Sequence, residues 1–314
     1  MPRKILFITP PGVHLLDISG PAHIFYEAKE YDADIDLFFV SINKENRTSS
    51  SAGLNFYDLL PFNQFELTNE DFIFIPGIYF PSLLDTNFID DCKPFFEWLN
   101  VQNKKGVNIC SICNATFLLA ESGILYNKSC TTHWKRIAKF KERYPKIEIK
   151  DNRLFVIDGN IFTSAGITSG IDLALYILEQ KFGTSLAVDV AKEAVIYFRR
   201  SESDPQLSIY LQYRNHLNER IHKVQEFLIE NIGNQFTHLD IAESVHMSVR
   251  NLTRLFKKTT GITIHQYTEK LRLEKALNLL AEKNKVEMVA SECGFKSVSQ
   301  LHSVLRKYKK NYLK

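Results

Sequence analysis

The sequence lacks the features that mark membrane and secreted proteins. It has no run of about 18 apolar residues, the shortest length that suggests a membrane-spanning helix. The first twelve residues, MPRKILFITPPG, contain only a four-residue apolar run before two prolines. That run is too short for the core of a signal peptide. We therefore expect a cytoplasmic protein without a membrane partner.

Cysteine is also scarce. The 314 residues include five cysteines, an odd number, without the spacing of a disulfide framework. A zinc site would have to draw on Cys110, Cys113, Cys130 and His133, but the single Cys-x-x-Cys has no second pair. The sequence therefore predicts neither a disulfide nor a metal ion, and it indicates no other cofactor.

Net charge is small, at +3, but it is unevenly distributed. Residues 221–314 contain 16 Lys and Arg against 9 Asp and Glu, whereas residues 1–220 contain 23 against 27. The basic charge is therefore concentrated at the C-terminal end. Such an asymmetry favours a polyanionic partner, although a solvated basic surface would look the same.

Strand-like and helix-like segments alternate over roughly the first 185 residues, which predicts a mainly parallel sheet with helices on both faces, an α/β fold of flavodoxin type. Ligand sites in such sheets lie at the carboxyl ends of the strands. The predicted strands are 4–9, 34–42, 72–77, 107–112 and a hairpin over 154–164; the predicted helices are 20–30, 88–106, 116–123 and 167–183.

Beyond this region the β signals stop and the sequence is helical in character. The polar stretch SESDPQ, with its proline, is the best candidate for a linker. We therefore divide the chain into a first domain over 1–200, a linker over 201–218 and an all-α domain over 219–314.

The all-α domain contains two similar helix-turn-helix patterns. In THLDIAESVHMSVRNLTRLFKKTT (237–260), Thr237 and Ser248 can cap two short amphipathic helices, and Gly261 ends the second. In VEMVASECGFKSVSQLHSVLRKYK (286–309), Gly294 marks the turn and Ser297 the second cap. The long helical segment 264–283 can hold the two units at a fixed separation, so that two helices enter the major groove roughly 34 Å apart.

This region resembles the AraC/XylS family of bacterial transcription regulators, through DIAESVHMSVRNLTRLFKKTTG, RLEKALNLL and VASECGFKSVSQLHSVLRKY. The resemblance implies that double-stranded DNA is the partner. Arginine can contact guanine in a bidentate way, and serine or threonine can contact bases or phosphates. The positions that it implies for DNA contact are Arg250, Thr253, Arg254 and Lys257 in the first unit and Val298, Ser299, His302 and Ser303 in the second.

A different motif stands in the first domain, where the apolar strand VNICSI leads directly into Cys113 and a helix. This is the pattern of a nucleophile elbow, a reactive side chain on a tight strand-to-helix turn. The next residue, Asn114, cannot act as a general base. Ala115 occupies a position where a tight turn favours glycine. We therefore expect either that the strained turn costs more free energy to form or that the turn is relaxed.

The segments SICNATFLLAESGILYNKSCTTHW (111–134) and TSAGITSGIDLALYILE (163–179) resemble the ThiJ/PfpI group of class I glutamine-amidotransferase-like domains. Because the two helix-turn-helix units follow this domain in the sequence, the whole chain is similar to GlxA-type regulators. The resemblance implies a homodimer and a domain that senses a small-molecule effector. It places Asp17 near the thiol of Cys113, although Asp17 could instead cap a helix that begins near Gly20.

We therefore predict that the elbow, with Cys113 and Asp17, is degenerate and does not catalyse a reaction. The residues expected to line a ligand pocket are Asp17, Gly77, Cys113, Asn114, His133 and Ser164. His133 and Trp134 could equally be structural residues of the core. Two other hypotheses stay open: a cysteine hydrolase or amidase, and a thiol-based redox regulator that uses Cys113.

Overall fold

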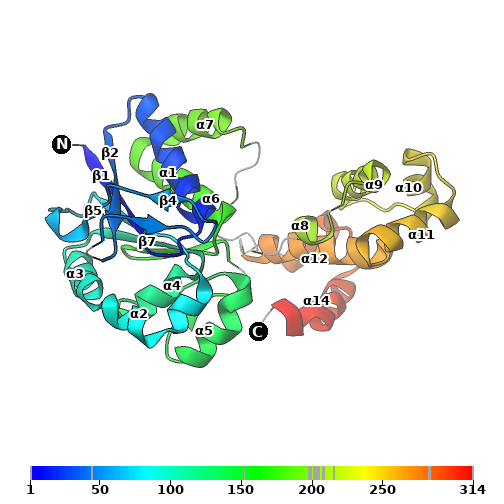
Figure 1. The fold of residues 1–314 in the computed structure, drawn as a ribbon. Helices are drawn as coiled ribbons and strands as arrows, with labels where there is room; N and C mark the ends of the chain where they lie inside the picture. Colours follow the sequence, from blue (N-terminus) through cyan, green and yellow to red (C-terminus); the bar gives the residue numbers. More distant parts are fainter. Residues whose placement is uncertain are drawn as a thin grey trace. The chain divides into compact units, whose positions relative to one another are not determined.

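The chain divides into two compact units, Met1–Gln206 and Leu207–Lys314, which are described separately (Figure 1). The structure, a computed structural model, describes residues 2–43, 45–151, 153–196, 200, 206, 209–214, 216–281 and 284–312. Much of the predicted linker, 201–205, 207–208 and 215, lies outside the described residues. Within that range, Ile209–Tyr213 forms helix α8, and Ile209 is buried in the core of the second unit. In the part of the chain that is described, no helix has the length and apolarity to cross a membrane.

The first unit is built on a seven-stranded sheet with the order β10-β11-β7-β6-β1-β2-β5. All neighbouring strands are parallel except β10 and β11, which form the predicted hairpin. The mainly parallel sheet is therefore confirmed. Its strands are β1 (Arg3–Thr9), β2 (Ile35–Ser41), β5 (Leu60–Pro61), β6 (Phe72–Ile75), β7 (Asn108–Ile112), β10 (Phe155–Asp158) and β11 (Ile161–Ser164). Two small pairs stand apart, β3 (Thr48–Ser49) with β4 (Asn55–Phe56) and β8 (Ser129–Cys130) with β9 (Glu148–Ile149).

Helices cover both faces of this sheet because its strands are apolar on both sides. In β1, Ile5 and Phe7 pack into one core and Leu6 and Ile8 into the other, as the alternation of side chains along a strand requires. The first core is closed by α1 (Leu15–Glu30), α6 (Thr168–Phe182) and α7 (Thr184–Glu193) (Figure 1). The second is closed mainly by α3 (Lys93–Lys104), α4 (Thr116–Glu121) and α5 (Ile137–Arg143), with α2 (Thr86–Asp91) at its edge.

Two predicted helix boundaries were wrong, and proline is involved in both. Helix α1 begins at Leu15 rather than near Gly20, so Pro21 lies inside the helix and not at its start. The single helix predicted over 88–106 is two helices that meet at Cys92, with Pro94 in the first turn of the second. Proline fits a first turn because that position needs no intrahelical N–H bond, but a helix can also continue through it.

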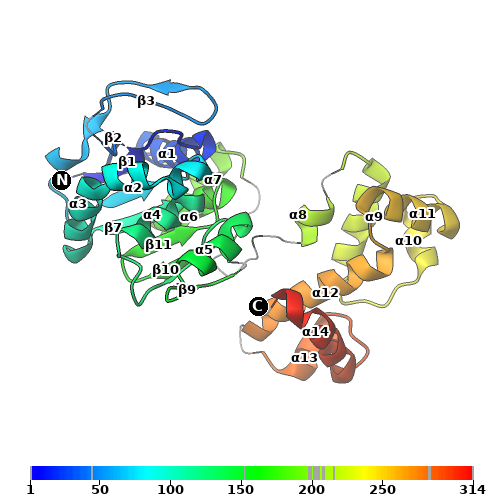
Figure 2. The ribbon, with the colours of Figure 1, turned by 60° about the horizontal axis from the view of Figure 1, so that its bottom comes forward.

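The second unit contains the two predicted helix-turn-helix units, α10 (His238–Ser244) with α11 (Val249–Thr260) and α13 (Val286–Glu292) with α14 (Val298–Tyr312). Helix α12 (Ile264–Ala281) joins them, and α9 (Glu219–Glu230) packs beside the first (Figure 2). Tyr267 and Leu271 of α12 are buried in the core of the first helix-turn-helix unit. Leu273 and Ala276 of the same helix are buried in the core of the second helix-turn-helix unit. One helix thus supports both units, as the sequence predicts.

Candidate functional site

Cys113 follows the last residue of β7 and has the backbone geometry of an elbow. Its φ is +60°, in the left-handed region that is unfavourable for any residue with a Cβ. A short 3₁₀ turn, Cys113–Ala115, leads from it into α4. Of the two outcomes predicted from Ala115, a costly or a relaxed elbow, the relaxed one was wrong. The strain falls on Cys113, while Ala115 has a helical φ of −62°.

Two glycines, Gly77 and Gly166, pack closely against this turn. A Cβ on Gly166 would lie 2.4 Å from the Cβ of Cys113, and a Cβ on Gly77 would lie 2.9 Å from that atom and 2.4 Å from Oδ2 of Asp17. Real Cβ atoms do not come this close to their neighbours. The polypeptide backbone therefore covers the elbow directly, and only glycine fits at these two positions.

Asp17 lies in the first turn of α1 and is only 1% exposed. It does not cap the helix, because the N-cap position belongs to His14. Its Oδ1 accepts a hydrogen bond of 2.8 Å from the amide of Ile167, just before α6. Oδ2 lies 3.4 Å from Nδ1 of His14 but has no hydrogen-bond partner among the described residues. Asp17 therefore bridges from α1 to the start of α6, beside Cys113.

Asn114 has a structural role that the sequence did not predict. Its Oδ1 accepts a hydrogen bond of 2.9 Å from the amide of Ile78, and its Nδ2 donates one of 2.7 Å to the carbonyl of the same residue. Both ends of the side chain are thus engaged with the backbone that follows β6. Asn114 therefore holds the elbow in place, and these two bonds use one of its N–H groups and one lone pair of its oxygen.

His133 lies near the elbow, and Ser164 ends the neighbouring strand. Thr132, just before His133, donates a hydrogen bond of 2.8 Å to the carbonyl of Cys113. Burial lowers the pKa of His133, whose ring stacks on Trp134. Trp134 is 44% exposed and is not a core residue. Ser164 is fully buried, and its Oγ has no hydrogen-bond partner among the described residues.

The thiol of Cys113 is in the wrong environment for a nucleophile. Burial, reinforced by the carboxylate of Asp17, raises its pKa well above the ordinary value. The thiol is therefore protonated at neutral pH, whereas catalysis needs the thiolate. Burial also raises the pKa of Cys92 and Cys130 to about 12 and that of Cys293 to about 11.

All five cysteines are buried and free. We expect less than one equivalent of thiol to react with a disulfide reagent such as DTNB in the native protein at pH 7, and all five to react after denaturation. A single fast-reacting thiol that is lost in Cys113→Ser would contradict this expectation and support the redox hypothesis.

The four-residue zinc set considered from the sequence does not assemble. Cys110 packs in the core on one face of the sheet and Cys130 in the core on the other. A single metal ion could not be shared between them.

Gln206 is a site residue that sequence reasoning missed. It is the last residue of the first unit and is 8% exposed. Its Nε2 donates hydrogen bonds to Oγ1 of Thr131 (3.0 Å) and to the carbonyl of Thr132 (2.9 Å). Thr132 also donates a hydrogen bond to the carbonyl of Cys113. Hydrogen bonds through Thr132 therefore connect Gln206, at the end of this unit, to the elbow. A single glutamine in a polar stretch gives no sequence signal for this.

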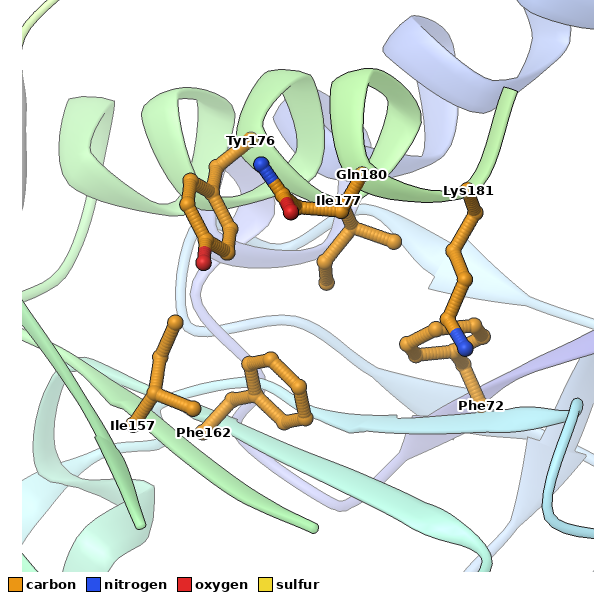
Figure 3. A pocket seen from close by; sticks show the side chains of 7 residues that line it. All are labelled: Phe72, Ile157, Phe162, Tyr176, Ile177, Gln180 and Lys181. Atoms are coloured by element: carbon orange, nitrogen blue, oxygen red, sulfur yellow. The ribbon is translucent and has the colours of Figure 1, made fainter. Parts of the chain in front are cut away.

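A separate pocket of about 300 Å³ lies between α6 and the sheet (Figure 3). Phe72 and Phe162, on its floor, stand near the starts of their strands, at the opposite end of the sheet from Cys113. It is therefore not the pocket predicted at the elbow. Its other lining residues are Ile157, Tyr176, Ile177, Gln180 and Lys181.

In the first helix-turn-helix unit, the predicted caps are present and the predicted contact residues face solvent. Thr237 and Ser248 accept hydrogen bonds from backbone amides at the starts of α10 and α11, and Gly261 ends α11 with a φ of +80°. Leu252 and Phe256 of α11 are buried. The residues predicted to contact DNA, Arg250, Thr253, Arg254 and Lys257, are all exposed.

In the second helix-turn-helix unit, the four predicted positions differ in exposure. Ser299, His302 and Ser303 are exposed on α14, but Val298 packs partly against the core beneath it and is a poor candidate for a base contact. Arg306, which is not among the predicted positions, is exposed one turn after His302, and its Nε donates a hydrogen bond to the carbonyl of that residue. The four positions predicted to contact DNA in this helix include no arginine, so Arg306 adds one to the exposed face of α14.

Comparison with known proteins agrees with this division of the chain. The HTH-type transcriptional regulator CdhR of Pseudomonas aeruginosa is 34% identical over 205 residues, covering 65% of this chain and 60% of that protein. Isonitrile hydratase of Pseudomonas putida is 29% identical over 190 residues, covering 60% of this chain and 75% of that enzyme. The chain spans about three-fifths of the length of the first curated regulators that it matches.

Among solved structures, DJ-1beta of Drosophila melanogaster matches with a TM-score of 0.53 at 22% identity, covering 63% of this chain and all of that one. This likeness concerns the fold of the first unit. A helix-turn-helix domain model matches residues 241–311, and the DJ-1/PfpI family model matches residues 3–180. The chain therefore belongs to the DJ-1/PfpI family, and in it an AraC-type helix-turn-helix domain follows the family's fold.

Proposed function

We propose that this protein is a DNA-binding transcription regulator of GlxA type that works in the cytoplasm as a homodimer. The observation that carries the proposal is the second unit, in which one helix, α12, supports two helix-turn-helix units. The basic side chains Arg250, Arg254 and Lys257 project from the first of these into solvent. The excess of basic residues after residue 220 favours the same partner.

The features of the first unit favour a role as a sensor domain over a role as an enzyme. Its elbow keeps the strained backbone of a nucleophile at Cys113, but the thiol is buried and protonated and Asn114 is committed to the backbone. Strained geometry of this kind is common at ligand sites. We infer that the unit binds a small-molecule effector near the elbow and is not an enzyme.

Gln206 offers a route from the effector to the DNA-binding unit. An effector regulates only if it binds one arrangement of the protein better than another. A ligand that moved Thr132 would disturb the two hydrogen bonds of Gln206, at the point where the chain leaves the first unit. A screen of amino acids, methylated amines and small aldehydes by thermal shift would supply a ligand for testing this route. In Gln206→Ala, we expect that ligand to raise Tm still but no longer to change DNA affinity.

Lys257 provides a test of the DNA-binding surface that needs no knowledge of the operator. We expect Lys257→Ala to weaken binding to all duplexes alike, and to reduce the steepness of log Kd against log salt by about 1, because one phosphate contact is lost. The matched control is Lys223→Ala, which removes an exposed lysine from α9. Equal effects of the two changes would argue against a phosphate contact by Lys257.

The second candidate function is a cysteine hydrolase or hydratase, which the retained elbow and the likeness to isonitrile hydratase favour. It predicts turnover of amide, isonitrile or glyoxal substrates that disappears in Cys113→Ala. Absence of turnover in the intact protein, with DNA binding present, would leave the regulator as the function.

A further inference from the structure

Three potential metal ligands of different chemistry meet at the elbow. One ring nitrogen of His14, one carboxylate oxygen of Asp17 and Sγ of Cys113 all lie within 4.8 Å of one another. The ion pair between His14 and Asp17 joins Nδ1 to Oδ2 at 3.4 Å. Among the described residues, this is the one group of at least three His, Cys, Asp or Glu side chains with such proximity. His14 and Asp17 come from the start of α1, and Cys113 comes from the end of β7, so the fold brings the group together.

The buried carboxylate gives a second indication of a ligand. Oδ2 of Asp17 makes no well-aligned hydrogen bond with a described residue, although the residue is 1% exposed; its neighbours are the two other members of the group, His14 at 3.4 Å and the thiol of Cys113. A buried polar atom without a partner is costly, and such atoms call for an explanation such as a water or an ion. The oxygen faces the group formed with His14 and Cys113: it lies 3.4 Å from Nδ1 of His14, and a Cβ on Gly77 would meet both this oxygen and the Cβ of Cys113.

We propose that the elbow is a binding site for a thiophilic divalent cation of the Zn²⁺ class, held by Nδ1 of His14, Oδ2 of Asp17 and Sγ of Cys113. One nitrogen, one oxygen and one sulfur ligand suit the borderline softness of Zn²⁺. As the metal–sulfur bond forms, the thiol gives up its proton to solvent. The carboxylate and the thiolate then balance the two positive charges, so that no net charge is buried.

The surroundings of the group are suited to this role. Oδ1 of Asp17 is fixed by the amide of Ile167, which leaves Oδ2 as the oxygen for the metal. The side chain of His14 is 34% exposed and gives the ion a path from solvent. Three protein ligands leave a fourth tetrahedral position open, where water or an effector could bind. The inference does not depend on DNA binding, because the site lies wholly in the first unit.

The test is metal binding by the full-length protein after removal of metals with a chelator. We expect one Zn²⁺ per chain, and with Co²⁺ as the probe we expect the near-ultraviolet absorption band of a cobalt–thiolate bond. Cys113→Ser should abolish the band. His14→Gln and Asp17→Asn should each weaken Zn²⁺ binding by about tenfold or more, since each removes one of three ligands.

Cys110→Ser is the matched control, because Cys110 is also a buried cysteine of β7 but lies outside the group. It should retain the band and the affinity. Melting temperatures measured without metal show that each variant is folded. The proposal is overturned if Co²⁺ produces no thiolate band in the intact protein, or if folded variants at all three positions bind Zn²⁺ as the intact protein does.

Discussion

Gly166→Ala is expected to lower the free energy of unfolding of the first unit by about 3 kcal/mol or more, because a clash adds to an unfavourable backbone conformation. Gly166 has a φ of +102°, and the added methyl group would lie 2.4 Å from the Cβ and 2.7 Å from the Cα of Cys113. The latter contact is with backbone and cannot be relieved by a side-chain rotation. Either the elbow or the loop before α6 would have to move.

Gly183→Ala is the matched control. Gly183 has nearly the same φ, +95°, but a Cβ there would meet nothing within 4 Å. Its cost should be that of the backbone conformation alone, about 1–3 kcal/mol, since φ +95° with ψ 162° is a region that almost only glycine adopts. The loss in Gly166→Ala should exceed it. Denaturant unfolding followed by tryptophan fluorescence reports on this unit alone, since both tryptophans, Trp98 and Trp134, lie in it. Equal losses for the two variants would show that the elbow is not closely covered by Gly166.

Arg250→Ala and Arg254→Ala are each expected to weaken binding to a selected DNA site by about 10- to 100-fold, which corresponds to the loss of a bidentate contact to a guanine. Both side chains are exposed on α11, whose opposite face packs Leu252 and Phe256 into the core. Their loss should therefore leave the fold intact. A binding site can be obtained by selection from random duplexes, and the affinities measured by fluorescence anisotropy.

Arg220→Ala, which removes an exposed arginine from α9, controls for the loss of one positive charge. It should change affinity by less than about threefold, because α9 is outside both helix-turn-helix units. If the Arg250 and Arg254 variants behaved like this control and stayed folded, α11 would not be a recognition helix.

Most of the fold could be predicted from the sequence because its signals are local. The buried strands β1, β6 and β7 are short apolar runs bounded by turns, and capping residues such as Ser248 mark helix starts directly. The start of α1 was missed because Pro21 resembles a first-turn proline, and nothing in the sequence shows that the helix extends upstream of it.

The site was predictable only in part, because its geometry depends on contacts between distant segments. The strand-to-helix pattern identified Cys113, but the bond from Ile167 to Asp17 spans 150 residues and the contact of Gly166 with the elbow spans about fifty. The role of Asn114 as a tether to Ile78, and that of Gln206 beside Thr132, likewise follow from tertiary packing alone. No periodicity or motif encodes such pairs.

The most direct test of the proposed function is the affinity of the full-length protein for DNA from the region upstream of its own coding sequence. The comparison is a duplex of the same length and composition in scrambled order, at about 150 mM salt, where non-specific binding is weak. We predict a preference of about a thousandfold, which is typical of specific regulators. Equal affinity for the two duplexes would contradict the account of this chain as a sequence-specific regulator.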